Sequence, residues 1–407
     1  MPYDRPRLRH LDIVPVQAQG RQAFLLRDPQ RLSQAELVVP ADIAYLLSQF
    51  DGTHTVREAQ VSYVRRFGSL LTSARINELL GRLDQALFLD TERFRGFRAQ
   101  LEEEFRVRPT RAAAQAGKSY EEGAGAFVRT WEPILAGAGA PTDFSLDDRR
   151  PALIAPHYDM IAARECYASA YALLGRAEPP EVVVILGIAH TGGEQPFILT
   201  RKPFETPFGA LETDSEMIDR LTESASFDPF ADEIVHRDEH SIEFQAVLLH
   251  FLCREQADPP RIVPLLCGAY HRRGGEFVNP AEVEPANAFL EKLRAVIAAD
   301  ERRVGVIASA DLSHNGARFG QPPVTPVHLD LARRHDTALL EHAQMGDADG
   351  FYRTLSGERD RYNVCGFPAI YALLRALPIE KGRLLNYRQA AEPQTRSCVS
   401  FASVGLR

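Results

Sequence analysis

The sequence lacks several features that mark specialised classes of protein. Nowhere do about 18 apolar residues follow one another, as a membrane-spanning helix requires, and the N-terminal stretch has no apolar segment of a secretion signal. The five cysteines form no CxxC pair, and their odd number argues against a disulfide framework. Basic residues are not in excess, because the formal net charge is −8, so neither nucleic acid nor a membrane is an expected partner. We expect a cytoplasmic protein with reduced thiols.

What the chain does contain is typical of globular proteins. Hydrophobic residues make up 45% and charged residues 25% of the sequence, which is close to the average for packed domains. The 407 residues suit two or three domains. Changes in composition predict a first domain over residues 1–108, an Ala- and Gly-rich linker over 109–150, and a larger domain over 151–407.

Residues 1–108 combine a predicted strand pair with helices. Alternating apolar residues in LDIVPVQAQGRQAFLLRDP predict a hairpin with its turn at Gln19-Gly20. Apolar residues recur at helical spacing over 43–50 and 76–83, and the pair Thr55 and Glu58 predicts a capped helix start between them. This order resembles a winged-helix module and, loosely, the peptide-binding domains of the PqqD type. The alternative is a small helical cap without a ligand of its own.

Residues 151–407 alternate apolar runs with helical stretches. The runs are ALIA (152–155), VVVIL (182–186), IVPLL (262–266) and VGVIA (304–308), followed by LLNY and VSFASVGL near the C-terminus. Apolar runs without alternation predict strands that are covered on both faces. We therefore expect an α/β fold built on a helix-flanked, mostly parallel sheet.

Polar side chains directly follow three of these runs. His157 comes after the first run, His190 after the second, and Asp311 and His314 after the fourth. Ligands of open α/β sheets bind beyond the carboxyl ends of the strands, so we expect these four side chains at one edge. One such histidine alone would be interpreted as a hydrogen-bonded structural residue. A cluster of imidazoles with a carboxylate predicts a metal site or an acid/base site.

Two other segments contain further candidates. In HRDEHSIEFQ, His236 and His240 are spaced to share a helix face, although the order of residues differs from the HExxH of zinc proteases. His240 opens an apolar helix and needs a polar partner, whereas His236 is equally well interpreted as an exposed residue. Cys365 precedes an apolar helix, whose dipole would stabilise a thiolate. Cys267 is the rival candidate, and core packing is expected for the other cysteines, Cys166, Cys253 and Cys398.

Five ordered motifs, PHYD, GIAHTG, DEHSIEFQ, SADLSHNG and NVCGFPAI, resemble those of the Memo family, including the bacterial Memo-like proteins of the AmmeMemoRadiSam gene context. The resemblance covers residues 151–407 and implies a fold like that of the class III extradiol non-haem iron dioxygenases. It implies three metal ligands, His157, His190 and Cys365. It also implies three further pocket residues that approach the metal, Asp311, His314 and His240.

The chain departs from the family pattern in three ways. The first motif commonly reads PHAGY, but here Tyr158, Asp159 and Met160 follow the histidine. The second commonly reads GPSH or GTSH, and GIAH removes a hydroxyl donor beside the metal. The N-terminal domain is additional to the minimal family member. The loop after His157, and with it the class of ligand accepted, is therefore expected to differ.

The implied ligand set indicates the chemistry. Two histidines and a thiolate suit Fe(II), while Cu or Zn would also bind. We expect His314 to act as general acid or base, Asp311 to orient it or a metal-bound water, and His240 to supply another proton or hydrogen bond. The first hypothesis is an iron-dependent oxidoreductase that acts on an unknown small molecule or peptide.

Two alternatives remain open. A thiolate in place of the usual carboxylate exposes the sulfur to oxidation, so dioxygenase activity need not accompany the fold. One is a non-catalytic, metal-containing adaptor whose N-terminal domain recruits a peptide or a partner enzyme. The family context implies a radical SAM or AMMECR-type partner. The other is a metal-dependent hydrolase.

Overall fold

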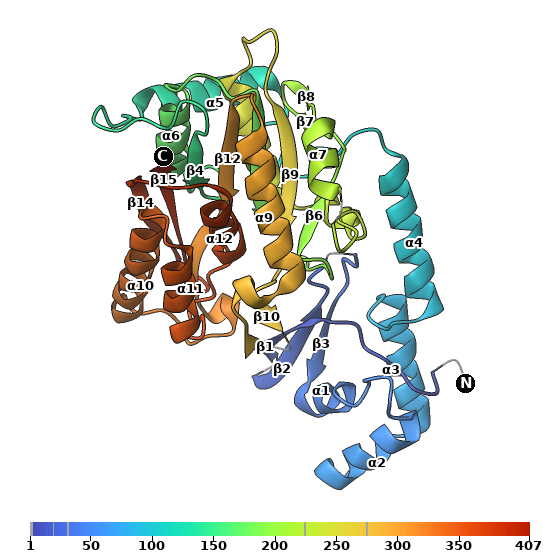
Figure 1. Cartoon of the computed structure of the whole chain (residues 1–407). Coiled ribbons are helices and arrows are strands. Elements are labelled where there is room, and N and C mark those ends of the chain that lie inside the picture. Colours follow the sequence, from blue (N-terminus) through green and yellow to red (C-terminus); the bar gives the residue numbers. More distant parts are fainter. Residues whose placement is uncertain (1–2, 19, 31, 224, 274–275) are drawn as a thin grey trace. The chain divides into compact units, whose positions relative to one another are not determined.

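The computed structural model describes residues 3–18, 20–30, 32–223, 225–273 and 276–407 (Figure 1). The chain divides into two compact units, Met1–Val107 and Arg108–Arg407. Among the described residues, no helix has the length and apolar character needed to cross a membrane.

The N-terminal unit has a small antiparallel sheet followed by helices. The strands β1 (Asp12–Ala18), β2 (Arg21–Arg27) and β3 (Glu36–Pro40) pair in that order, and Ala18 lies opposite Arg21. The predicted hairpin is therefore confirmed, although Gln19 of its turn lies outside the described residues. The helices are α1 (Ala41–Leu47), α2 (Val56–Phe67), α3 (Ser73–Gln85) and α4 (Glu92–Val107).

Local capping and one apolar core explain where these helices lie. The predicted capping box of Thr55 and Glu58 opens α2, and the Thr72 side chain caps α3. The core includes Leu46, Leu47, Ile76, Leu80, Leu83 and Phe88. The resemblance of this unit to a winged helix stays a prediction.

The second unit is built on an eight-stranded sheet in the order β13-β15-β4-β12-β5-β9-β6, with β14 paired to β15. The four central strands are parallel: β4 (Ala152–Ala155), β12 (Val304–Ser309), β5 (Val182–Ile188) and β9 (Arg261–Cys267). Antiparallel strands extend the sheet at both sides: β6 (Phe197–Leu199), β13 (Asp311–Gly316), β14 (Gly382–Glu392) and β15 (Ser397–Leu406). The predicted α/β fold and the predicted strands are confirmed.

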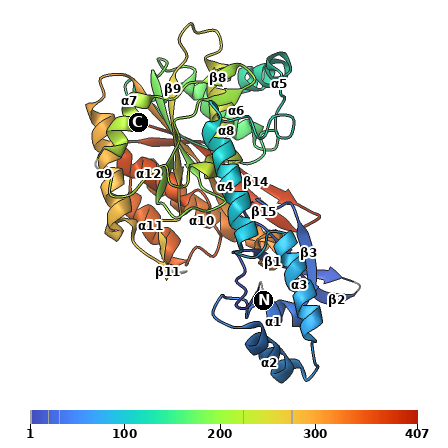
Figure 2. The same ribbon diagram turned by 90° about the vertical axis from the view of Figure 1, so that its right-hand side faces the viewer.

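Helices cover both faces of this sheet, as Figure 2 shows with α9, α11 and α12 on one side and α5 and α6 on the other. One core joins Val184 of β5 to α7 (Ser215–Thr222), α9 (Glu284–Ala299), α10 (Pro326–Gln344), α11 (Ala348–Gly357) and α12 (Phe367–Ala376). The other joins Val183 to α5 (Ala124–Gly137), α6 (Arg164–Leu174) and α8 (His240–Leu252). Successive residues of β5 thus point into different cores, which explains why its run is continuously apolar.

Shorter elements lie in the connections of this unit. Two small ladders pair β7 (Phe204–Thr206) with β8 (Gly209–Leu211), and β10 (Arg272–Arg273) with β11 (Glu276–Phe277). Three turns of 3₁₀ helix occur, η1 (Glu233–Arg237), η2 (Pro280–Glu282) and η3 (Ala317–Phe319), in the described part of the chain. Of these elements, η1 matters for the site because it leads directly into α8.

Residues 109–150 have a different place from the linker expected for them. They belong to the second unit and contain α5. Phe127 and Trp131, one helical turn apart on α5, are both 0% exposed and lie in the core with α6 and α8. The Ala- and Gly-rich composition that indicated a partly helical linker therefore surrounds two aromatic residues that pack in the core beside the sheet.

The strand order brings three loops to one edge of the sheet. Strand β12 lies between β4 and β5, and all three run parallel. The second residue after each strand is a candidate site residue, His157 after β4, His190 after β5 and Asp311 after β12. This edge is the usual binding position in open α/β sheets.

Candidate metal centre

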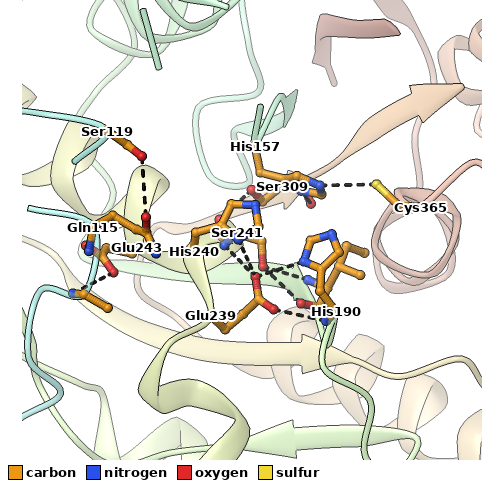
Figure 3. Close-up of polar contacts among 12 residues, drawn as sticks. Gln115, Ser119, His157, His190, Glu239, His240, Ser241, Glu243, Ser309 and Cys365 are labelled. Atoms are coloured by element: carbon orange, nitrogen blue, oxygen red, sulfur yellow. Dashed lines mark hydrogen bonds and ion pairs between the residues drawn. The ribbon is translucent and has the colours of Figure 1, made fainter. Parts of the chain in front are cut away.

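Three imidazoles converge at this edge (Figure 3). The ring centroids of His157 and His190 are 4.8 Å apart, those of His190 and His240 are 4.9 Å apart, and those of His157 and His240 are 5.5 Å apart. One nitrogen of each ring lies within 4.8 Å of the other two. The structure thus places His240, which was expected to supply a proton or hydrogen bond, beside two of the expected metal ligands.

Two contacts hold the start of α8, and with it His240, against the end of β5. The hydroxyl of Ser241 accepts the backbone N–H of Ile188 at 2.9 Å and also lies 3.2 Å from the carbonyl oxygen of Ile188. His157 is buried whereas His190 is exposed. One side of the cluster therefore faces solvent.

Hydrogen bonds determine which ring nitrogen is available in each imidazole. The Nδ1 of His157 lies 3.0 Å from the Ser309 carbonyl oxygen, which can only accept a hydrogen bond. The Glu239 Oε1 lies 3.0 Å from Nδ1 of His190 and 3.2 Å from Nδ1 of His240. In the neutral form of each ring, a donating Nδ1 leaves the lone pair on Nε2. Histidines that bind metals are commonly oriented by such a hydrogen bond from the other nitrogen.

The charges in the cluster agree with these roles. Burial would raise the pKa of Glu239, but the charges of His190 and His240 and their hydrogen bonds hold it well below its ordinary value. The group is thus an ionised acceptor. Burial, together with the charges of His190 and His240, lowers the pKa of His157 well below its ordinary value. His157 is therefore a neutral imidazole, the form that binds a metal.

Cys365 and Asp311 lie against His157. The Cys365 Sγ is 3.2 Å from Nε2 of His157, and Oδ2 of Asp311 is 3.6 Å from the same nitrogen. Oδ1 of Asp311 accepts the backbone N–H groups of His157 at 3.0 Å and Tyr158 at 3.2 Å. Burial raises the pKa of Asp311 to about 7.

Burial shifts the pKa of Cys365 in the direction opposite to the effect of the helix dipole. A thiolate was expected at this position because α12 begins nearby, but burial and the charge of Asp311 raise the pKa of Cys365 well above its ordinary value. Desolvation outweighs the dipole of the short helix here. The thiol would become a ligand by losing its proton as a cation binds.

His314 lies in β13, three residues after Asp311, with a shift of strand register between the two. Its Nδ1 is 2.9 Å from the Leu312 carbonyl oxygen, and its backbone N–H donates to the Tyr362 carbonyl at 2.6 Å. Burial lowers the pKa of His314 to about 4, and the charge of His190 contributes to the shift. His314 is therefore a neutral imidazole within electrostatic range of the cluster.

The remaining candidates lie in the core. His236 is 1% exposed rather than exposed, its Nε2 donates to the Ile198 carbonyl at 3.0 Å, and burial lowers its pKa to about 3. Cys267, the rival to Cys365, is buried at the end of β9. The other three cysteines are also buried, as expected. The side chains of these residues are buried and are not part of the imidazole cluster.

Sequence reasoning gave no role to Gln245 or Ser309, whose hydrogen bonds support the residues of the site. Gln245 of α8 donates from Nε2 to the Pro156 carbonyl at 2.6 Å and to the Ser309 hydroxyl at 2.8 Å. Ser309 donates to the Ser241 carbonyl at 2.6 Å. The available signal was a set of polar residues at the start of an otherwise apolar, fully buried helix.

Comparison with known proteins gives the family. The sequence model of the Memo-like protein family matches residues 111–405. A MEMO1 family protein of Aquifex aeolicus is 26% identical over 403 residues, which are 98% of this chain and 99% of the relative. One of Thermus thermophilus is 29% identical over 356 residues, 86% of this chain and 99% of the relative. One of Methanosarcina barkeri is 30% identical over 242 residues, 59% of this chain and 79% of the relative. The chain therefore belongs to the Memo-like protein family.

Proposed function

We propose that this protein binds one transition-metal ion, with Fe(II) as the first candidate, and acts as an oxidoreductase on a small molecule or peptide. The observation that carries the proposal is the convergence of the His157, His190 and His240 rings, with the Cys365 Sγ 3.2 Å from Nε2 of His157. We assign His157 and His190 as two ligands. Cys365 is the proposed third ligand, and His240 is its competitor for that place.

The donor set fits such an ion. Imidazole with either thiolate or a further imidazole suits iron, copper and zinc, and the exposed side of the cluster leaves room for a substrate. A bound iron ion would supply one-electron chemistry. Asp311, whose pKa is raised to about 7 by burial, would hold or release a proton near His157. His314 would act as a second proton carrier.

Anaerobic purification followed by metal analysis tests this proposal. We expect stoichiometric iron in the wild-type protein and its loss when His157, His190 and Cys365 are all changed to alanine. Metal retained by that triple variant would contradict the assignment. Cys365→Ser and His240→Gln, tested separately, would show which side chain is the third ligand. Zinc in place of iron, with ester or amide hydrolysis that needs no dioxygen, would favour the hydrolase instead.

The second candidate is an adaptor that recruits a peptide or partner enzyme. It is favoured by the separate core of the N-terminal unit and by the near-complete alignment with the Aquifex relative. The full-length triple variant separates the two functions. An adaptor would bind its partner equally well without the metal ligands, whereas an enzyme would lose turnover.

A further inference from the structure

We propose that Arg111 and Glu243 form a buried clamp that positions His190 and His240 for metal binding. This inference rests on the metal-binding function proposed above. It assigns a role to two residues that lie outside the imidazole cluster. Arg111 comes from the segment expected to be a linker, and the family match begins at this residue.

The clamp is a charged pair that is completely buried. Arg111 and Glu243 are both 0% exposed, and Nη1 of Arg111 forms an ion pair with Oε2 of Glu243. Glu243 also accepts the backbone N–H groups of Ala114 at 3.2 Å and Gln115 at 2.9 Å, and the hydroxyl of Tyr120 at 2.5 Å. Each carboxylate oxygen therefore has at least two donors, as a buried charge requires.

The rest of the guanidinium holds the turn that carries the site residues. Its Nε donates to the His236 carbonyl at 2.8 Å, and Nη2 donates to the Glu239 carbonyl at 2.6 Å. These carbonyls lie at the two ends of the turn between η1 and α8. A guanidinium presents its donors in a rigid, planar arrangement, so it fixes both carbonyls relative to each other.

Glu239 transmits this position to the imidazoles. Its carboxylate lies within hydrogen-bond distance of Nδ1 of both His190 and His240, and it also accepts the backbone N–H of His190 at 3.0 Å. A shift of the Glu239 backbone would therefore move both rings. The path runs from Arg111 to the Glu239 peptide, then through the carboxylate to His190 and His240.

Stability alone does not account for this arrangement. A buried ion pair is weak grounds for stability, because apolar residues of similar volume often replace one without loss. A cation near the start of α8 is also opposed by the helix dipole. The clamp itself is anchored, because the Arg111 N–H donates to the Pro203 carbonyl at 2.8 Å and its carbonyl accepts the Glu205 N–H at 2.9 Å. Arg111 is therefore a positioning residue.

Co(II) binding to the full-length protein tests the clamp. Arg111→Met removes the charge and both carbonyl contacts, and Arg111→Lys keeps the charge but cannot bind both carbonyls and Glu243 in the same geometry. We expect Co(II) affinity, measured by competition with a chelator, to fall about 10- to 100-fold in Arg111→Met. The visible absorption of bound Co(II) should change as well, because the ligand geometry changes. Arg111→Lys should restore part of the affinity.

Arg302→Met is the matched control. Arg302 precedes β12, at the opposite end of the strand from Asp311. It binds the buried carboxylates of Asp214 and Asp300, at 2.7 and 2.9 Å. This control should lower stability and leave Co(II) affinity and absorption unchanged. The proposal is overturned if Arg111→Met binds Co(II) with the affinity and absorption of the wild-type protein. It is also overturned if Arg302→Met weakens Co(II) binding as much as Arg111→Met does.

Two further outcomes also decide the matter. If the wild-type protein binds no Co(II), Fe(II) or Zn(II), the proposed function fails. In that case, crystal structures of the metal-free wild-type protein and of Arg111→Met test the clamp. Loss of the contact between Glu239 and His190 in the variant supports it, and an unchanged contact overturns it. If Arg111→Met does not fold, Arg111→Lys takes its place in both measurements.

Discussion

Gly187 shows how a single residue sets the distance between β5 and the start of α8. A Cβ atom built on it would lie 2.6 Å from Ile242 Cγ1, 2.7 Å from Ser241 Oγ and 3.0 Å from Leu266 Cδ2. Only glycine therefore allows Ser241 to reach the backbone of Ile188. That contact holds the neighbouring His240 in the cluster.

We predict that Gly187→Ala lowers the free energy of unfolding by about 1 to 3 kcal/mol, because it overpacks a buried contact. Since α8 must move away, metal affinity should fall as well. Urea denaturation and metal titration measure the two effects. Gly125→Ala on α5 is the control, because a Cβ there would meet only the guanidinium of Arg129 at 3.6 Å. Equal effects of the two substitutions would contradict the prediction.

His335 of α10 is a buried titratable residue outside the site. It is 8% exposed, it packs on Tyr362 with ring centroids 4.5 Å apart, and neither ring nitrogen has a hydrogen-bond partner among the described residues. Burial lowers its pKa from 6.5 to about 4. The unfolded chain therefore binds a proton between these pH values that the folded chain does not bind.

We predict that this residue makes the protein less stable as the pH falls. The stability contributed by the neutral ring is fully present above pH 6.5 and is lost as the pH falls toward 4. His335→Phe should remove this loss, about 2 kcal/mol at pH 4 after allowance for solvent screening. Urea denaturation of both proteins at pH 7 and pH 4 measures the difference. The same loss of stability in both would show that His335 is not responsible.

At the scale of elements, α8 combines core packing with support of the site. Every residue from Ser241 to Phe251 is buried, and its polar members have partners elsewhere in the second unit. Glu243 binds Arg111, and Gln245 reaches Pro156 and Ser309. A helix buried all round keeps such residues only where their hydrogen bonds are satisfied.

Helix α5 lies in the segment that was expected to be a linker, and its packing in the core can be tested. We predict that Trp131→Ala lowers the free energy of unfolding by about 3 to 5 kcal/mol, because it leaves a cavity in the core. Its neighbour Glu132 is exposed and forms an ion pair with Arg254 at 2.8 Å. Glu132→Ala should therefore change the stability by less than about 1 kcal/mol. Urea denaturation measures both effects. An unchanged free energy of unfolding in Trp131→Ala would favour the expected linker instead.

At the scale of the whole molecule, each unit has its own core, and every residue assigned to the site belongs to the second unit. We predict that a chain of residues 108–407 binds metal with an affinity within about twofold of the full-length protein, because its donors and their hydrogen-bond partners are all retained. Metal titration of the two chains, alongside circular dichroism to establish folding, measures this. Loss of metal from a folded 108–407 chain would mean that the N-terminal unit contributes to the site.

The amino-acid sequence by itself determined the local elements and the edge at which polar residues gather. Short continuous apolar runs indicated the buried strands, because a strand covered on both faces buries every one of its residues. The capping box at Thr55 specified where α2 begins, because the side chains that satisfy its first N–H groups are close in sequence. The placement of His157, His190 and Asp311 after parallel strands followed from the same runs.

Only the tertiary structure decided how the site is supported. Glu239 lies 49 residues from His190, and Arg111 lies 132 residues from Glu243, so no local pattern could pair them. Burial raised the pKa values of Cys365 and Asp311, because desolvation depends on what packs around a group. It also decided that residues 109–150 belong to the second unit. Position in sequence identified the side chains available for the site, and long-range packing determined their neighbours and protonation.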